Sequence, residues 1–192
     1  MSLDLTASEL QQRLAGYEHI LLDLGTGDGR FVRCMAEEHK KGFFIGLDAC
    51  RENLHQHSRA KLPNMLFVIA NAQALPLELN GLASQIMINF PWGSLLECLL
   101  NDHDAVLGRL ASIARPFAEI DLHLNGEALS ALGWPLESGT DQIQYVLAAN
   151  GWRTESRLPM DARLLRSFPT TWAKRLAFGR DPRAIQLRVQ RE

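Results

Sequence analysis

The stretch HILLDLGTGDGR, residues 19–30, decides the fold class of this chain. Its first half, residues 19–24, is an apolar run that predicts a buried strand. Three glycines then follow at every second position, and glycine lets a backbone turn sharply and approach a ligand without side-chain collision. A helix is expected over about residues 28–40, with free N–H groups at its N-terminus. A strand, a glycine-rich turn and a helix in this order predict a ligand site at the end of the first strand.

Strands and helices alternate through the rest of the chain. Further strands are expected over residues 43–47, 65–70, 85–90, 118–124, 151–158 and 184–189. Helices are expected from Thr6 onward and over residues 51–60, 94–114, 142–149 and 163–178. This alternation indicates βαβ units, so the expected fold is a doubly wound, Rossmann-like α/β sheet of seven strands. The segment before the last strand is rich in proline, tryptophan and basic residues, unlike a plain crossover helix, and the last strand is therefore expected to be antiparallel.

Two acidic residues flank the glycine-rich turn. Asp23 precedes the first glycine by two positions, where a carboxylate suits a ligand with a cationic amino group. Asp48 ends the second predicted strand, a position that accepts hydrogen bonds from ribose hydroxyls in doubly wound folds. The alternative role for Asp48 is a helix N-cap. The glycine spacing also differs from the Gly-x-Gly-x-x-Gly pattern of dinucleotide-binding enzymes.

This pattern resembles motif I and the following acidic motif of class I S-adenosylmethionine (SAM)-dependent methyltransferases. The resemblance implies that Asp23 and the glycine turn hold the methionine part of SAM, Asp48 its ribose, and the residues after the third strand its adenine. S-adenosylhomocysteine would be the product. The cofactor-binding residues implied are Asp23, Gly25, Thr26, Gly27, Gly29, Asp48, Ala72, Gln73, Pro91 and Ser94.

Two tryptophans stand beside this predicted site. Trp92 lies in FPWG directly after the fourth predicted strand, where open parallel sheets collect ligands. Trp172 opens the block WAKRLAFGR between the last two strands. Two rings from loops at one sheet edge could sandwich a base taken out of its stack. The alternative is that Trp92 packs at a helix start and Trp172 on its own helix.

The three blocks, residues 23–30, 90–93 and 172–180, together resemble the kanamycin–apramycin resistance methyltransferases, which modify N1 of adenine 1408 in the decoding site of 16S rRNA. The resemblance implies that Trp92 and Trp172 stack on the flipped adenine. It implies the 30S subunit as partner and places four basic residues against the rRNA: Lys174, Arg175, Arg180 and Arg183.

The chemistry implied by this resemblance needs no acid–base pair. Adenine N1 carries a free lone pair, so catalysis would come from in-line positioning of nucleophile and methyl group. Trp92, Trp172 and Thr170, the small hydroxyl position near cofactor and target, would form the catalytic set. The three cysteines show no metal-ligand spacing, and no metal is expected.

Length and charge set further expectations. With 192 residues the chain is expected to be one domain, residues 1–192, with a variable target-recognition segment at about 159–183. A monomeric, cytoplasmic protein without a membrane partner is expected, because the chain shows no signal peptide or bilayer-length apolar run. Residues 1–149 contain 10 Lys and Arg against 18 Asp and Glu, whereas residues 150–192 contain 10 against 4. The basic C-terminal quarter is either a phosphate-docking surface or a solvated face.

Two other classes of function stay open. A methyltransferase acting on a small molecule or another RNA is favoured by the acidic body and by segment 53–64, whose basic residues are Arg59 and Lys61 alone. Gln73 also stands where an acidic residue is usual in the family. A SAM- or RNA-binding module without turnover is disfavoured, because both ligand sites look complete.

Overall fold

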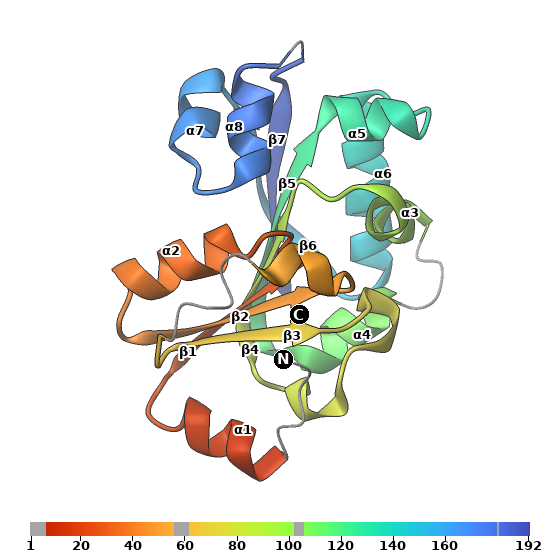
Figure 1. Cartoon of the computed structure of the whole chain (residues 1–192). Helices are drawn as coiled ribbons and strands as arrows, with labels where there is room; N and C mark the ends of the chain where they lie inside the picture. Colours follow the sequence, from red (N-terminus) through yellow and green to blue (C-terminus); the bar gives the residue numbers. More distant parts are fainter. Residues whose placement is uncertain (1–6, 56–61, 102–105, 180) are drawn as a thin grey trace.

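One seven-stranded sheet forms the centre of the computed structural model, which describes residues 7–55, 62–101, 106–179 and 181–192 (Figure 1). Its strands, in the order β3-β2-β1-β4-β5-β7-β6, are β1 (His19–Leu24), β2 (Gly42–Asp48), β3 (Met65–Ile69), β4 (Ala83–Asn89), β5 (Ala114–Asn125), β6 (Trp152–Met160) and β7 (Ala184–Arg191). β7 runs antiparallel to both β5 and β6, whereas the remaining neighbours are parallel. The expected seven strands and antiparallel last strand are confirmed.

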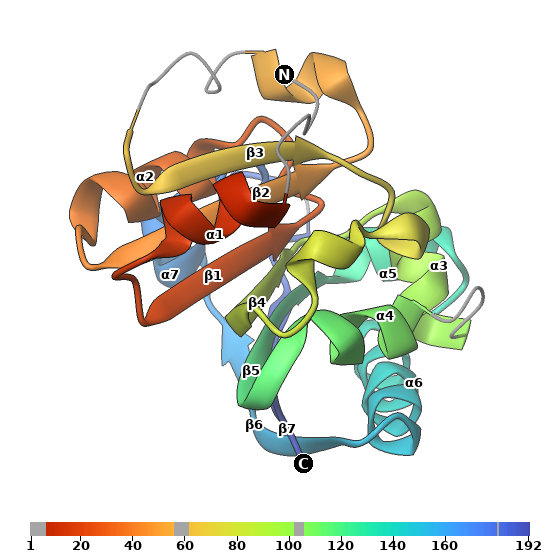
Figure 2. The ribbon, with the colours of Figure 1, turned by 90° about the horizontal axis from the view of Figure 1, so that it is seen from below.

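Helices cover both faces of this sheet. They are α1 (Ala7–Leu14), α2 (Arg30–Glu38), α3 (Gly93–Asn101), α4 (Val106–Ile113), α5 (Gly126–Ala131), α6 (Leu136–Ala149), α7 (Ala162–Ser167) and α8 (Thr171–Ala177), with 3-10 turns η1 (Arg51–His55), η2 (Ala72–Ala74) and η3 (Leu77–Leu79). Figures 1 and 2 show α3 and α6 on one side of the sheet and α2 and α7 on the other. Successive residues of β1 alternate between the two cores: Leu22 packs with α3, α4 and α6, and Leu21 packs with α2. This alternation is the period of two expected for a strand buried on both faces.

Several expected helices are shorter in the structure. The helix expected over 163–178 is two helices, because Pro169 has no N–H to donate and Thr170 begins α8 as its N-cap. The helix expected over 94–114 is α3 and α4, and Ala114 already belongs to β5. Over residues 51–60 the described part is the 3-10 turn η1. α5 was not expected; Asn125 caps it by accepting a hydrogen bond from Ala128 N at 2.7 Å.

A buried carboxylate holds the last strand in register. Asp121 on β5 is 1% exposed and faces Arg188 on β7, its register partner. Arg188 Nε and Nη2 donate to the two Asp121 oxygens at 2.8 and 3.1 Å, and Gln85 Nε2 on β4 donates at 2.8 Å. A one-residue slip would leave this carboxylate buried without its cation, so the ion pair selects the observed register.

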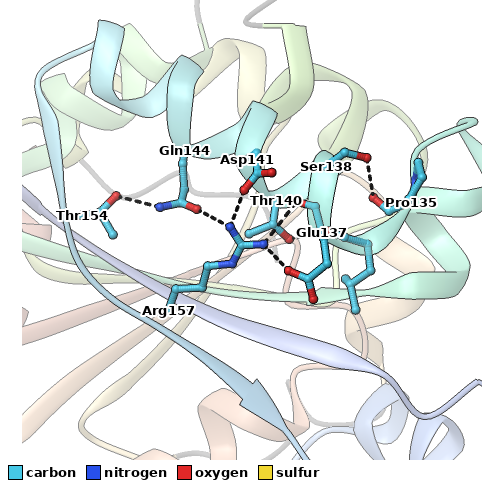
Figure 3. A network of polar contacts seen from close by, with 9 residues as sticks. Pro135, Glu137, Ser138, Thr140, Asp141, Gln144, Thr154 and Arg157 are labelled. Atoms are coloured by element: carbon cyan, nitrogen blue, oxygen red, sulfur yellow. Dashed lines mark hydrogen bonds and ion pairs between the residues drawn. The ribbon is translucent and has the colours of Figure 1, made fainter.

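A second polar network attaches the edge strand β6 to α6 (Figure 3). Arg157 of β6 donates to Asp141 Oδ1 at 2.5 Å and to Gln144 Oε1 at 2.9 Å, and it also pairs with Glu137. These carboxylates are largely exposed, so each pair adds little to the free energy of unfolding.

None of the helices within the described ranges is long and apolar enough to cross a membrane.

Candidate active site

A cavity of about 610 Å³ opens at the carboxyl ends of β1, β2 and β4, and the start of α8 forms one of its walls. Its lining includes the predicted residues Asp23, Gly25, Thr26, Gly27, Asp48, Ala72, Gln73, Pro91, Trp92, Ser94, Thr170, Trp172 and Arg175. The structure therefore brings the predicted cofactor residues and the predicted target residues into one continuous space. Gly29 does not line it.

The glycine-rich turn is folded by left-handed backbone angles. Gly25, Gly27 and Gly29 have φ of 73°, 58° and 76°, a region in which residues with a Cβ are strained. Gly29 has a packing role, because a Cβ on it would lie 2.6 Å from a ring carbon of Phe67.

The N–H groups of Gly25, Thr26 and Gly27 in this turn are bonded within the chain. Gly25 N and Thr26 N donate to Leu47 O at 2.9 Å, and Gly27 N donates to Asp48 Oδ2 at 2.8 Å. Arg30 N, at the start of α2, donates to the side chain of Asp28. The amides of this turn are therefore already bonded to acceptors within the chain, and carboxylates lie beside them. For both reasons, this end of the cavity suits a cationic group better than a phosphate.

Asp23 provides a carboxylate that is 1% exposed. Thr26 Oγ1 donates to its Oδ2 at 2.5 Å, and Asn89 Nδ2 donates to its Oδ1 at 2.9 Å. The pKa of Asp23 is raised to about 7, mainly by burial; the two hydrogen bonds act against this rise, and the charges of Asp48 and Asp28 add to it. A cationic ligand group beside Asp23 would favour the ionised form.

Asp48 lies in the cavity wall and also bonds the segment that leads into η1. Its Oδ1 accepts from Cys50 N at 2.8 Å and from Asn53 Nδ2 at 3.2 Å. Its Oδ2 accepts from Gly27 N at the cavity wall. A carboxylate offers about four acceptor sites, so capacity for ribose hydroxyls remains beside these three bonds.

The far end of the cavity is largely apolar. Ala72 and Gln73 form the turn η2, capped by Asn71, whose side chain accepts from Gln73 N at 3.0 Å. Leu95 and Cys98 of α3 face the same space, and Gln73 Nε2 lies 3.8 Å from Cys98 Sγ. These walls include Ala72 and Gln73, the residues predicted to border the adenine.

The two tryptophans meet at the open side. The Trp92 and Trp172 rings are stacked with centroids 5.5 Å apart and planes 29° from parallel. Trp172 is 41% exposed, and the Arg175 guanidinium lies 5.2 Å from its ring centroid. A base between two rings requires roughly 7 Å, two contact spacings of about 3.5 Å. The rings therefore contact each other here, and a base can enter only if they separate.

Local structure explains why these rings are held at this place. Phe90 has φ of +53° and donates its N–H to His123 O at 2.8 Å, which fixes the loop carrying Trp92. Thr170 Oγ1 accepts from Ala173 N at 3.0 Å as the cap of α8, the helix that carries Trp172. The predicted hydroxyl position thus has a structural role beside its place in the cavity wall.

Among the wall residues that were not singled out from the sequence, Asp28, Asn89 and Thr171 form hydrogen bonds at the cavity. Thr171 Oγ1 donates to Asp28 Oδ2 at 2.7 Å, a bond that joins the glycine-rich turn to α8. Asn89 ends β4 and donates to Asp23. The sequence offered a signal for Asn89, because it is a polar residue that ends an apolar strand beside the predicted site. It offered no signal for Thr171, because its contact with Asp28 joins segments that are far apart in the sequence.

The predicted rRNA-binding residues differ in their surroundings. Arg175 lines the cavity, and Lys174 is exposed on α8. Arg183 Nε and Nη2 each donate to the Asp181 carboxylate at 2.7 Å, so its charge is partly neutralised within the chain. Arg180, and Arg59 and Lys61 of the earlier segment, lie outside the described residues. Among the residues with described positions, no group of His, Cys, Asp or Glu could hold a metal ion.

Comparison with known proteins decides the family. The model of the NpmA family, 16S rRNA (adenine(1408)-N(1))-methyltransferase, matches residues 1–191. The chain belongs to this family. A 16S rRNA (adenine(1408)-N(1))-methyltransferase from Escherichia coli is 33% identical over 197 residues, covering 93% of this chain and 90% of the relative.

Solved structures agree with this family and fold. The aminoglycoside resistance methyltransferase NpmB1 matches with a TM-score of 0.80 and 30% identity, over 98% of this chain and 95% of that one. A tryptophan-to-alanine mutant of the family enzyme from Catenulisporales acidiphilia, solved with cosubstrate SAM, matches with a TM-score of 0.82 and 25% identity, over 98% and 92%. The class I methyltransferase fold and the family expected from the sequence are confirmed.

Proposed function

We propose that this methyltransferase transfers a methyl group from SAM to N1 of adenine 1408 of 16S rRNA in the 30S subunit, and thereby protects the decoding site from aminoglycosides. One observation carries the proposal: a single cavity joins the Asp23–Asp48 carboxylates to the Trp92–Trp172 pair. In a chain of this family, the carboxylate end of this cavity suits the cofactor, and the two rings would hold a flat base once they separate.

The residues present fit SAM. The buried Asp23 carboxylate suits the ligand's amino group, Asp48 its ribose hydroxyls, and the walls formed by Ala72 and Leu95 its adenine. When bound, SAM supplies an electrophilic methyl group on a sulfonium centre. The internally bonded amides of the glycine turn favour this cationic ligand over a dinucleotide, whose pyrophosphate needs free N–H donors.

The chain's own residues contribute positioning. Adenine N1 is a nucleophile with a free lone pair, so no side chain has to remove a proton. Trp92 and Trp172 would hold the base from its two faces, and Thr170 would border it from the start of α8. Holding two reactants in line converts a bimolecular encounter into an effectively unimolecular step.

Contact with the rRNA backbone is proposed for the exposed side of α8. Arg175 lines the cavity and Lys174 is exposed on the same helix, so both charges would be available to phosphates flanking a flipped nucleotide. Such contacts orient an enzyme on its substrate and carry no chemistry themselves. A ribosomal substrate also supports the expected cytoplasmic location.

The test is methyl transfer from labelled SAM to purified 30S subunits, followed by primer extension. A methyl group on N1 blocks Watson–Crick pairing, so a stop at adenine 1408 is expected. Subunits already methylated at that adenine form the matched control and should accept no label. Label transfer to small molecules with none to 30S subunits would favour the small-molecule reading instead.

A further inference from the structure

A buried histidine lies behind the cofactor carboxylate. Asn89 Nδ2 donates to Asp23 Oδ1 at 2.9 Å, and the other end of the same amide, Asn89 Oδ1, lies 2.8 Å from His123 Nδ1. His123 stands on β5 and is 2% exposed, and it does not line the cavity. Asp23, Asn89 and His123 thus form a hydrogen-bonded series that runs from the cavity into the sheet.

With Asp23 ionised, as it would be beside a cationic ligand, this hydrogen-bonded series has one consistent set of proton positions. Asn89 Oδ1 can only accept, so His123 Nδ1 must carry the proton that it shares. Burial, assisted by the Arg188 cation and opposed by Asp121, lowers the pKa of His123 to about 4, which keeps the ring neutral. If the Asn89 amide were reversed, its oxygen would face the Asp23 carboxylate. The His123 N–H therefore keeps the amide N–H₂ directed at Asp23.

The same imidazole also contacts an aromatic cluster beside the start of α8. Its ring meets the Phe168 ring edge-on, with centroids 4.5 Å apart. Phe168 also stacks on Phe31 at 5.9 Å and meets Phe90 edge-on at 5.8 Å. Because Phe168 lies two residues before the cap of α8, this aromatic cluster supports the helix that carries Trp172.

We propose that His123 is a positioning residue that serves both substrates at once. Its Nδ1–H orients Asn89, which holds the Asp23 carboxylate toward the amino group of SAM. Its ring face supports Phe168 and through it the placement of α8 and Trp172. The second half rests on the proposed function, whereas the first half concerns SAM binding alone.

Two substitutions separate the two contacts. His123→Asn places an amide nitrogen at the position of Nδ1 and keeps the donor, but it removes the ring. His123→Phe keeps a ring beside Phe168 and removes the donor, which leaves Asn89 Oδ1 without a partner. A purely structural role for His123 would lower the melting temperature of both variants and give no such division.

The measurements are the dissociation constant of SAM by calorimetry and the methylation rate of 30S subunits at saturating SAM. His123→Phe should raise the SAM dissociation constant about tenfold, the value of one hydrogen bond to a charged group. His123→Asn should restore SAM affinity to within about threefold of the parent and lose mainly methylation rate. SAM affinities that are equal in the two variants would overturn the proposal, as would equal losses of rate.

A double-mutant cycle tests the route through Asn89. In an Asn89→Leu background, His123→Phe should change SAM affinity no further, because the link is already broken. If His123→Phe does not fold, Asn89→Leu alone must show the same loss of SAM affinity, and parent-like binding would overturn the proposal. Calorimetry needs no rRNA, so a parent protein that binds SAM but leaves 30S subunits unmethylated would refute the proposed function and leave this test intact.

Discussion

The indole of Trp92, after β4, stacks directly on the indole of Trp172, at the start of α8. With their centroids 5.5 Å apart, the two rings contact each other. When a base binds, this one contact is replaced by two contacts, one between the base and each ring. An aromatic pair contributes about 0.5–1.5 kcal/mol, whereas each base–aromatic stack contributes about 1–3 kcal/mol. The exchange therefore favours the base once the rings have separated.

Replacing either tryptophan tests this exchange. Trp92→Ala and Trp172→Ala should each lower methylation about tenfold to a hundredfold, since one stack is lost. Phenylalanine keeps a π-face and should retain more activity at both positions. Trp172 is 41% exposed, so its variants should keep the parent melting temperature; Trp92 packs partly on the main core, and its alanine variant should be somewhat less stable. Unchanged methylation by the folded fraction of both variants would contradict the clamp.

The raised pKa of Asp23 predicts a pH dependence of SAM binding. Below about pH 7 this carboxyl is protonated in the free protein and must lose its proton to pair with a cationic amino group. Affinity should therefore fall by up to tenfold per pH unit below about 7, and it should fall again above about pH 8 as the ligand's amino group deprotonates. Calorimetry across this range checks the profile. Asp23→Asn should bind more weakly and lose the acidic limb; an acidic limb that persists in this variant belongs to another group.

The proposed binding role of Asp48 can be separated from its hydrogen bonds within the chain. Asp48→Ala should weaken SAM binding by about 1–3 kcal/mol through lost ribose hydrogen bonds, and it should also lower stability because Gly27 N and Cys50 N lose their acceptor. Asn53→Ala removes one bond to Asp48 Oδ1 and keeps the Asp48 carboxylate in the cavity wall, so it is the comparison variant. Calorimetry and thermal melts on both variants decide. A lower melting temperature with parent SAM affinity in Asp48→Ala would mean that this residue has a structural role only.

The ion pair of Arg183 changes the expectation for the basic residues. Lys174→Ala and Arg175→Ala should weaken 30S binding and leave SAM affinity near the parent value, and the loss should shrink as salt is raised. Arg183→Ala should have a smaller effect, because Asp181 already holds that guanidinium. Filter binding at two salt concentrations measures both. Equal losses for all three variants would show that the Asp181 pair opens on the ribosome.

The register of β7 depends on its pairing with Asp121. Arg188→Met should lower the free energy of unfolding by about 1–3 kcal/mol, because it removes two of the donors of a buried carboxylate. Chemical denaturation measures this value. Arg153→Met, whose ion pair with Glu155 is largely exposed, is the matched control and should cost under about 1 kcal/mol. Similar losses in the two variants would show that the Asp121 pair does not select the register.

Short-range patterns in the chain were sufficient for the fold and for most of the cavity wall. β1 has the predicted bounds, and the glycine-rich turn, Asp23 and Asp48 follow where expected, because strand period, turn glycines and strand-end carboxylates are properties of a few adjacent residues. Tertiary structure alone decided which side chains meet. His123 reads in the sequence as one more residue of a buried strand, and its link to Asp23 exists only because β5 pairs with β4 in a register that brings it beside Asn89. The contact of Trp92 with Trp172 likewise depends on how α8 packs over the end of the sheet, since a ring–ring distance is set by the relative placement of whole elements and by no local pattern.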